Sequence, residues 1–236
     1  MVSAAYYLKK ERIMDHEQSL SLYREGKKLY DLVDIDFINK RFKNVVFVDW
    51  ETVYVWLPSG LDSLHIGAGS VIGPHVYFFG ETHIGEHTMI QPGTRLTRST
   101  IGSRCNIGGH IIDACIGSDV ATGPNTEITR STIMEHVTAK HFCYLGDTKI
   151  GRHTNIGAST ITANYDGIQK NKTVIGEHVK TGIHSNLVST QKNNKGALRI
   201  GDGAIIGANA IITQDVPAGA VVVGLNNIIQ IREVYE

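Results

Sequence analysis

One histidine of this sequence stands in a setting that suits acid–base chemistry. His141 is followed three residues later by Tyr144, and then by Asn155 and Asn164. Imidazole in general titrates near pH ~6.5, so its neutral form can take a proton from an attacking nucleophile at neutral pH. Tyrosine and asparagine side chains are neutral donors and acceptors. The pattern indicates a general base with polar partners, although a histidine among eleven is more often a satisfied core or surface residue.

The elements that must position these side chains come from a repeat. From Leu64 onward the dipeptide Ile-Gly recurs, often at intervals of six residues. The pairs begin at Ile66, Ile72, Ile84, Ile101, Ile107, Ile116, Ile150, Ile156, Ile175, Ile200 and Ile206. A hexapeptide period is typical of a parallel β-helix, in which one aliphatic side chain per short strand points into a triangular prism. An antiparallel sandwich would instead show period-two alternation.

Stacked coils bring distant residues together. Residues near 141, 158–164 and 176–183 should lie on adjoining coils, so we expect His141, Asn155 and the segment after residue 162 to approach one another. Polar, turn-rich segments interrupt the repeat, and such interruptions map to loops that leave the prism. We therefore expect a β-helix over 58–236, with loops near 162–172 and 189–199.

The first 57 residues have a different pattern. Apolar residues at helical spacing predict a helix over 17–37, and a shorter one over 5–14 is compatible with the sequence. Residues 45–50 and 53–56 are rich in β-branched and aromatic side chains, which predicts strands. We expect a helical and strand cap over 1–57 that covers the open end of the prism. Docking of a separate protein chain is the alternative.

Composition excludes several classes of function. Lys plus Arg (23) equals Asp plus Glu (23), so no surplus of charge favours nucleic acid or an anionic membrane as a partner. Three cysteines without motif spacing make a disulfide framework improbable and suit a reducing compartment. No segment approaches the ~18 apolar residues of a membrane span. We expect a soluble, cytoplasmic protein.

Three motifs follow one another over residues 140–176. They are HxxYLGD from His141, NIGAxTITxNYDG from Asn155 and KxKTxIG from Lys170. In this order they resemble the acetyltransferase half of the bifunctional N-acetylglucosamine-1-phosphate uridyltransferase / glucosamine-1-phosphate acetyltransferase family. A weaker similarity runs over residues 23–54. The resemblance implies a left-handed β-helix, a homotrimer with active sites between subunits, and N-acetyl transfer from acetyl-coenzyme A, a co-substrate and not a tightly bound cofactor.

The resemblance also implies roles for single residues. His141 matches the general base, Tyr144 and Asn155 match positions that hold the sugar, and Lys170 matches a substrate-facing lysine. The positions that line the acetyl-coenzyme A site match Ala158, Asn164, Tyr165 and Ala208. An amine must lose a proton as it attacks a thioester, and the anionic oxygen that forms needs preorganised donors. We expect the acceptor to be an amino-sugar phosphate similar to glucosamine-1-phosphate.

The sequence departs from the family at its phosphate-binding positions. The Arg-Pro-Gly turn and the lysine before the base are not matched, and Arg95 and Arg130 are the candidate substitutes. Ile183 stands where a serine lines the coenzyme site, and Leu225 where an arginine meets the coenzyme phosphates. The glycine-rich nucleotide loop is not found in these residues, so we expect no uridylyl transfer from them. Another amino sugar, even a nucleotide-linked one, could be the acceptor.

Two other functions remain open from the sequence. A non-catalytic hexapeptide-repeat scaffold or regulatory remnant would explain the missing phosphate ligands, whereas the residues of the three motifs oppose it. Some left-handed β-helix trimers, such as the gamma-type carbonic anhydrases, bind zinc through histidines, and a catalytic zinc needs three converging imidazoles. His178 with His184, and His83 with His87, are the candidates, but their spacing around the Ile-Gly pairs does not match.

Overall fold

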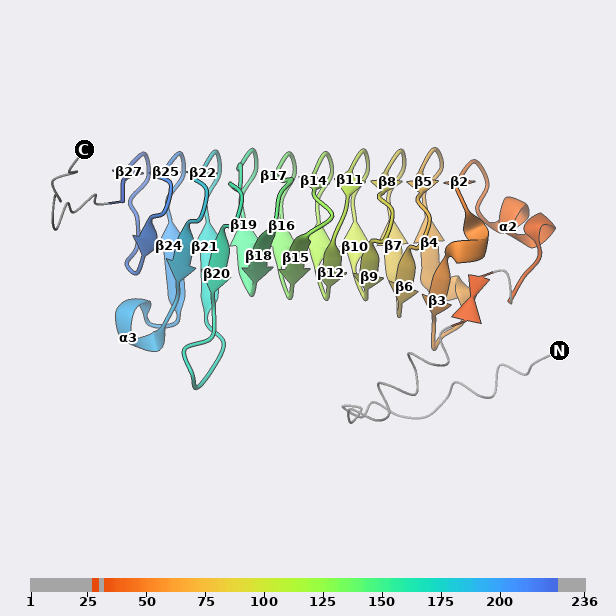
Figure 1. Ribbon diagram of the computed structural model, residues 1–236, viewed down its shortest axis with the longest axis horizontal. Coiled ribbons are helices and arrows are strands. Elements are labelled where there is room, and N and C mark those ends of the chain that lie inside the picture. Colours follow the sequence, from red (N-terminus) through yellow and green to blue (C-terminus); the bar gives the residue numbers. More distant parts are fainter. Residues whose placement is uncertain (1–26, 30–31, 225–236) are drawn as a thin grey trace, which may run out of the picture.

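The computed structural model describes residues 27–29 and 32–224, which form a left-handed parallel β-helix (Figure 1). We name the faces of its triangular prism A, B and C. Face A contains β1 (Lys27–Lys28), β3 (Tyr54–Trp56), β6 (Tyr77–Phe79), β9 (Arg95–Thr97), β12 (His110–Ile112), β15 (Thr126–Thr129), β18 (Cys143–Gly146), β20 (Ile161–Ala163), β23 (Asn186–Val188) and β26 (Ile211–Ile212). Face B contains β2 (Val46–Phe47), β5 (Val71–Ile72), β8 (Met89–Ile90), β11 (Asn106–Ile107), β14 (Ala121–Thr122), β17 (Thr138–Ala139), β22 (Lys180–Thr181), β25 (Ile205–Ile206) and β27 (Val221–Val222). Face C contains β4 (Leu64–Ile66), β7 (Thr82–Ile84), β10 (Thr100–Ile101), β13 (Cys115–Ile116), β16 (Thr132–Ile133), β19 (Thr148–Ile150), β21 (Lys172–Ile175) and β24 (Ala197–Ile200).

The core is a stack of mostly aliphatic side chains, with Phe78, Thr122 and Thr181 among the exceptions. On face A, Ile111 pairs with Ile128 and Ile128 with Leu145, and all three are fully buried. The isoleucines of the Ile-Gly pairs form equivalent columns on faces B and C, which explains the repeat. Neighbouring strands lie about 4.8 Å apart, so each side chain contacts those of the coils before and after it. The prediction of a hexapeptide β-helix is confirmed.

Because the core side chains are stacked in columns, removing a single methyl group from one of them should lower the stability of the protein. Replacing Ile128, which is fully buried, with valine should lower the free energy of unfolding by about 0.5–1.5 kcal/mol, because the site cannot collapse around the space. Ile211 on the same face is 68% exposed and serves as the matched control, whose valine variant should differ little from wild type. Urea unfolding of both variants measures this. Equal losses would contradict the assignment of the core.

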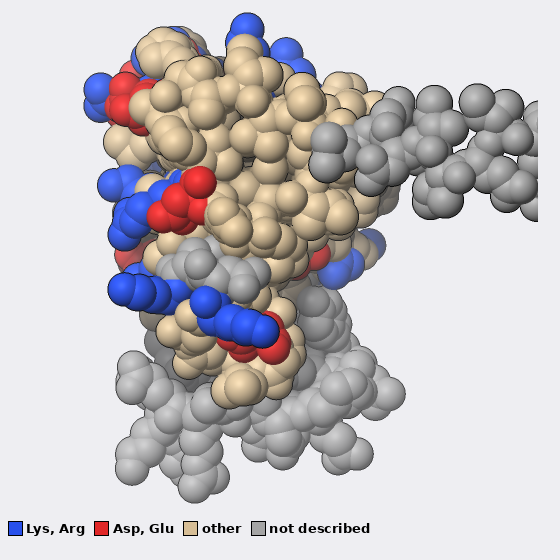
Figure 2. Space-filling view, turned by 90° about the vertical axis from the view of Figure 1, so that its left-hand side faces the viewer, with Lys and Arg blue, Asp and Glu red and all other residues tan. Residues whose placement is uncertain are grey.

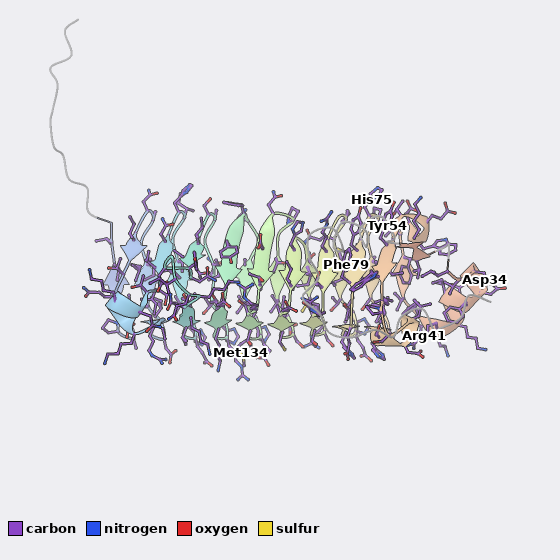
Figure 3. All side chains as sticks on the ribbon, turned by 90° about the horizontal axis from the view of Figure 1, so that it is seen from below. Asp34, Arg41, Tyr54, His75, Phe79 and Met134 are labelled. Atoms are coloured by element: carbon purple, nitrogen blue, oxygen red, sulfur yellow. The ribbon has the colours of Figure 1, made fainter. Side chains whose placement is uncertain are left out.

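The N-terminal end of the prism is covered by α2 (Ile35–Arg41) (Figures 1 and 3). Asp34 caps this helix by accepting a hydrogen bond of 2.8 Å from the Phe37 backbone N–H. Ile38 and Phe42 are buried in the same core as the coils. The helix therefore hides the open end of the stack, as expected of a cap.

Two boundaries differ from the sequence prediction. The helix expected over 17–37 is wrong at Lys27–Lys28, which form β1 antiparallel to β3, and α2 begins only at Ile35. The strand pairing satisfies backbone groups that β3 would leave at an open edge. Residues 5–14 and 17–26 lie outside the described residues. The first coil also starts early, since β2 and β3 already pair in parallel with β5 and β6, before residue 58.

Single turns of 3-10 helix occur at Trp50–Thr52 and Leu61–Ser63. None of the helices in the described ranges has the length and hydropathy of a membrane span. Seen from the C-terminal end, basic and acidic side chains lie next to one another, without a broad area of one sign (Figure 2). This mixture agrees with the balanced composition of the chain.

Two insertions leave the prism at the same corner (Figure 1). The first follows β20, and the second contains α3 (Gln191–Asn194). Gln191 Nε2 donates to Asn171 Oδ1 over 3.2 Å and so joins the two. Asp166 orders the first insertion: its carboxylate accepts the Gln169 backbone N–H and Asn171 Nδ2, each over 2.9 Å. These bonds, with the Ile168 N–H, lower the pKa of Asp166 to about 2.

Candidate active site

His141 lies exposed at the corner between faces B and A, where β17 ends and β18 begins. Its backbone carbonyl accepts a hydrogen bond of 3.0 Å from Thr126 Oγ1, which also bonds the Ala139 carbonyl over 2.9 Å. Gly123 packs against this corner so closely that a Cβ atom there would lie 1.9 Å from the Lys140 carbonyl oxygen. The backbone at His141 is therefore held firmly, while the imidazole faces outward.

Three candidate donor-site residues continue the line of His141. Strands β18, β20, β23 and β26 pair in one register along face A. This register puts Ala158, Ile183 and Ala208 at the corner position of His141 on the three following coils, at steps of about 4.8 Å. Ile183 is 51% exposed, and Phe142, which follows His141, is 55% exposed. At the position of His141, the following coils therefore present small and apolar side chains, with His184 next to Ile183.

Asn155 lies on the other side of this corner. It sits on face B, where it bridges Thr138 of β17 and Lys180 of β22 and so links the two parts of that sheet. Its Oδ1 accepts a hydrogen bond of 2.6 Å from Thr138 Oγ1, and the residue is exposed. The corner of His141 thus separates Asn155 on face B from Tyr144 on face A.

The other predicted polar residues gather at the far end of β18. Asp147, at the corner between faces A and C, accepts hydrogen bonds of 2.8 Å from both Nε and Nη2 of Arg130. Asn164 Nδ2 donates to the same carboxylate. A Cβ atom on Gly146 would lie 2.5 Å from the Tyr144 hydroxyl and 2.7 Å from Asn164 Nδ2. We call these five residues, Arg130, Tyr144, Gly146, Asp147 and Asn164, the Asp147 cluster.

Charges in the Asp147 cluster stabilise one another. Burial of the Asp147 carboxylate raises its pKa, but the hydrogen bond and charge of Arg130, the Asn164 amide and the Lys170 ammonium outweigh this and hold the pKa below its usual range. The hydrogen bond to Asp147 raises the pKa of Arg130. Asp147 therefore stays ionised, and Arg130 charged, at neutral pH.

Lys170 and Tyr165 lie on the first insertion. They face each other in an antiparallel bridge, and both are exposed. The influence of Lys170 on Asp147 shows that its ammonium lies near the cluster. The Tyr165 hydroxyl instead donates to the Gly167 carbonyl over 2.9 Å, at the outer part of the loop. The charge of Lys170 thus acts on Asp147, whereas the Tyr165 side chain points outward.

Of the two candidate arginines, only Arg130 joins the cluster. Arg95 lies over the Tyr77 ring, with 4.8 Å between its guanidinium carbon and the ring centroid. The register of β9, β12, β15 and β18 puts Arg95 three coils, about 14 Å, before Tyr144. The roles of Asp147 and Gly146 were not predicted from the sequence, although the Gly-Asp pair directly after Tyr144 in the first motif was the signal.

The histidines considered for zinc lie apart. His178 stacks on His153 at a centroid distance of 4.9 Å, at the corner between faces C and B, whereas His184 lies at the corner between faces B and A. His83 stacks on His65 and contacts Glu81. Within residues 27–29 and 32–224, no three His, Cys, Asp or Glu side chains gather where they could hold a metal ion.

Because Gly146 has no side chain, the Tyr144 hydroxyl and the Asn164 amide can occupy the space beside it. Replacing Gly146 with alanine should push the Tyr144 hydroxyl and the Asn164 amide out of place, since both would lie within 2.7 Å of the new methyl group. We expect the KM for the acceptor to rise about tenfold, as misplaced binding groups weaken substrate positioning. The melting temperature should change little, because the ends of side chains can move. An unchanged KM in steady-state kinetics would contradict this role of Gly146.

No model of a known protein family matches the chain. The bifunctional protein GlmU of Thermotoga petrophila is 36% identical over 192 residues, which are 73% of this chain and 40% of that protein. The GlmU protein of a Synechococcus species is 32% identical over 201 residues, 77% of this chain and 42% of that protein. A solved structure, the Arabidopsis UDP-N-acetylglucosamine acyltransferase, is 20% identical with a TM-score of 0.43, covering 77% of this chain and 68% of that one. That likeness is too distant to bear on function. The chain spans about two fifths of the length of the curated relatives it matches, and over most of its own length it is a relative of the GlmU proteins.

Proposed function

We propose that the chain transfers the acetyl group of acetyl-coenzyme A to the amine of an amino-sugar phosphate. One observation carries the proposal: the residues of the first motif run across face A, from His141 at the corner before β18, past Tyr144 within the strand, to Asp147 at the corner after it. Asn164 of the second motif joins Asp147 there. A base and a set of cationic and polar binding groups therefore lie along one strand.

In this proposal His141 accepts the proton that the acceptor amine loses. The nitrogen attacks the thioester carbon, the carbon–sulfur bond breaks, and coenzyme A leaves as a thiol once it has taken up a proton. The products are the N-acetylated sugar and coenzyme A. A positioned base of this kind contributes typically ~10²–10⁴-fold to the rate.

The acceptor would lie on face A. Tyr144 offers a hydroxyl and Lys170 supplies positive charge for a phosphate group, whereas the fork of Arg130 is already bound to Asp147. The donor would follow the corner strip past Ala158 and Ala208, with Ile183 between them. Asn164, carried over as a donor-site residue, lies in the Asp147 cluster beside Tyr144 and away from the corner strip, so we assign it to the acceptor.

A convex corner cannot enclose two substrates alone. His141 is exposed and Asn155 lies around the corner on face B, so a second wall is needed to exclude water and hold the acceptor. We propose that a neighbouring copy of the chain supplies it, in a homotrimer with sites between subunits. Tyr165, 62% exposed on its loop, would then contact the neighbouring copy.

Two measurements on the purified chain test this function. Calorimetry should show binding of coenzyme A, and amino-sugar phosphates, glucosamine-1-phosphate first, should release free thiol from acetyl-coenzyme A. A non-catalytic scaffold would bind no coenzyme A. Binding without thiol release from any amino sugar would overturn the proposed acceptor class.

A further inference from the structure

We infer that Asp147 is a positioning residue, which orients Arg130, Asn164 and, through them, Tyr144 for binding of the acceptor. This inference rests on the proposed function. The carboxylate lies between three successive coils: Arg130 belongs to the coil before it and Asn164 to the coil after. Its side chain is only 16% exposed, and both of its oxygens accept hydrogen bonds from Arg130.

An internal comparison separates this role from a structural one. Asp113 occupies the same corner two coils earlier, with the same positive φ of 51°. It accepts from Arg98 in the same forked geometry, over 2.7 and 2.9 Å. The Asp113 side chain is 38% exposed, whereas that of Asp147 is 16% exposed. The Arg98 side chain is 56% exposed, whereas that of Arg130 is 35% exposed. The fork itself is thus a repeated feature of this corner.

Only the later pair has further contacts that lead to the candidate site. Asn164, itself nearly buried, turns its NH₂ group to Asp147. An amide that directs its NH₂ group one way directs its carbonyl oxygen the other way, so Asp147 fixes which end of Asn164 the acceptor meets. Replacing the carboxylate with an amide would remove this preference, because Asn164 could then turn either end towards it.

Asp147 also fixes Arg130, and the Asn164 amide that it orients lies beside the Tyr144 hydroxyl. Two of the Arg130 nitrogens are held by Asp147, and Nη1 donates to Thr129 Oγ1 over 2.9 Å, so the plane of the guanidinium is fixed. The Tyr144 hydroxyl and the Asn164 amide meet over Gly146, where a Cβ atom would lie 2.5 Å from the hydroxyl and 2.7 Å from Asn164 Nδ2. A forked ion pair that is mostly removed from water holds its geometry better than a single exposed contact. The Tyr144 hydroxyl therefore depends on a carboxylate that it does not touch.

The test compares Asp147→Asn with the matched control Asp113→Asn. The acceptor KM of Asp147→Asn should rise about 10- to 100-fold, which corresponds to the loss of hydrogen bonds to a charged group. The affinity for coenzyme A should stay within twofold of wild type. Asp113→Asn should keep both values, although each variant loses one ion pair. A variant that merely folds less well would have a lower maximal rate, but the KM of its folded molecules would be unchanged.

A second variant guards against misfolding of the first. Arg130→Gln leaves the carboxylate and should raise the acceptor KM by a similar factor, and the double variant with Asp147→Asn should be little worse than either single one, since both act through one pair. An unchanged acceptor KM in both single variants, or an equal rise in Asp113→Asn, would overturn the inference. Turnover by the wild-type protein would still uphold the proposed function in that case. A wild-type protein without turnover on any amino-sugar phosphate would overturn the function, and this inference with it.

Discussion

Replacement of His141 with alanine should lower turnover by about 10²–10⁴-fold. The imidazole is the proposed proton acceptor of the amine, and neither Tyr144 nor Asn155 can replace it as a base at neutral pH. The side chain is exposed, so the variant should fold and melt like wild type. Coenzyme A should bind with nearly unchanged affinity, because the strip of Ala158 and Ala208 remains. Single-turnover kinetics with calorimetry measures both quantities.

The control for this prediction is His110→Ala. His110 is another exposed histidine on face A, two coils before Tyr144 in the same register. Its replacement should leave turnover within about twofold of wild type. Turnover that survives in His141→Ala, or falls equally in both variants, would show that another group takes the proton.

The second large effect is expected from Gly123→Ala. A Cβ atom at this position would lie 1.9 Å from the Lys140 carbonyl oxygen, and ordinary contacts begin at 3.4 Å, so the peptide next to His141 must shift by about 1.5 Å. Overpacking against backbone costs about 3 kcal/mol of the free energy of unfolding, at the upper end of such changes. A displacement of this size at a catalytic group can lower turnover about 10²-fold.

Gly73→Ala separates the two consequences. Gly73 follows its face B strand at the same corner near the other end of the prism, and a Cβ atom there would lie 2.7 Å from the Pro92 nitrogen. This variant should lose stability by overpacking, but its folded molecules should turn over at the wild-type rate. Urea unfolding and assays below the transition measure both variants. Equal turnover in the two variants would contradict the account of the corner at His141.

The fold could be predicted from the repeat because each Ile-Gly pair reflects two local conditions of the β-helix. The isoleucine must point inward, and the glycine must pass close to the next coil, as at Gly67, where a Cβ atom would meet the Glu86 nitrogen at 2.6 Å. Where no such repeat exists, the prediction failed. Helical spacing over 17–37 did not reveal that Lys27–Lys28 would pair with the free edge of β3. That pairing depends on an edge distant in the sequence.

The sequence proposed candidate site residues but not their arrangement. Motif spacing placed His141 and Ala158 near each other, and the register bears this out. It did not show that Asn155 would face outward on face B, because the direction of a side chain near a corner depends on where the strand ends. It also did not show the Asp147 cluster, which joins Arg130 and Asn164 from different coils. Such contacts depend on the number of residues per coil, which varies here.

The most direct test of the central claim is a crystal structure of the chain with coenzyme A and an amino-sugar phosphate. We predict the acceptor nitrogen within about 2.6–3.2 Å of a ring nitrogen of His141, beside the coenzyme sulfur and with the sugar on face A. A structure in which both ligands bind but the acceptor nitrogen lies away from His141 would contradict the account.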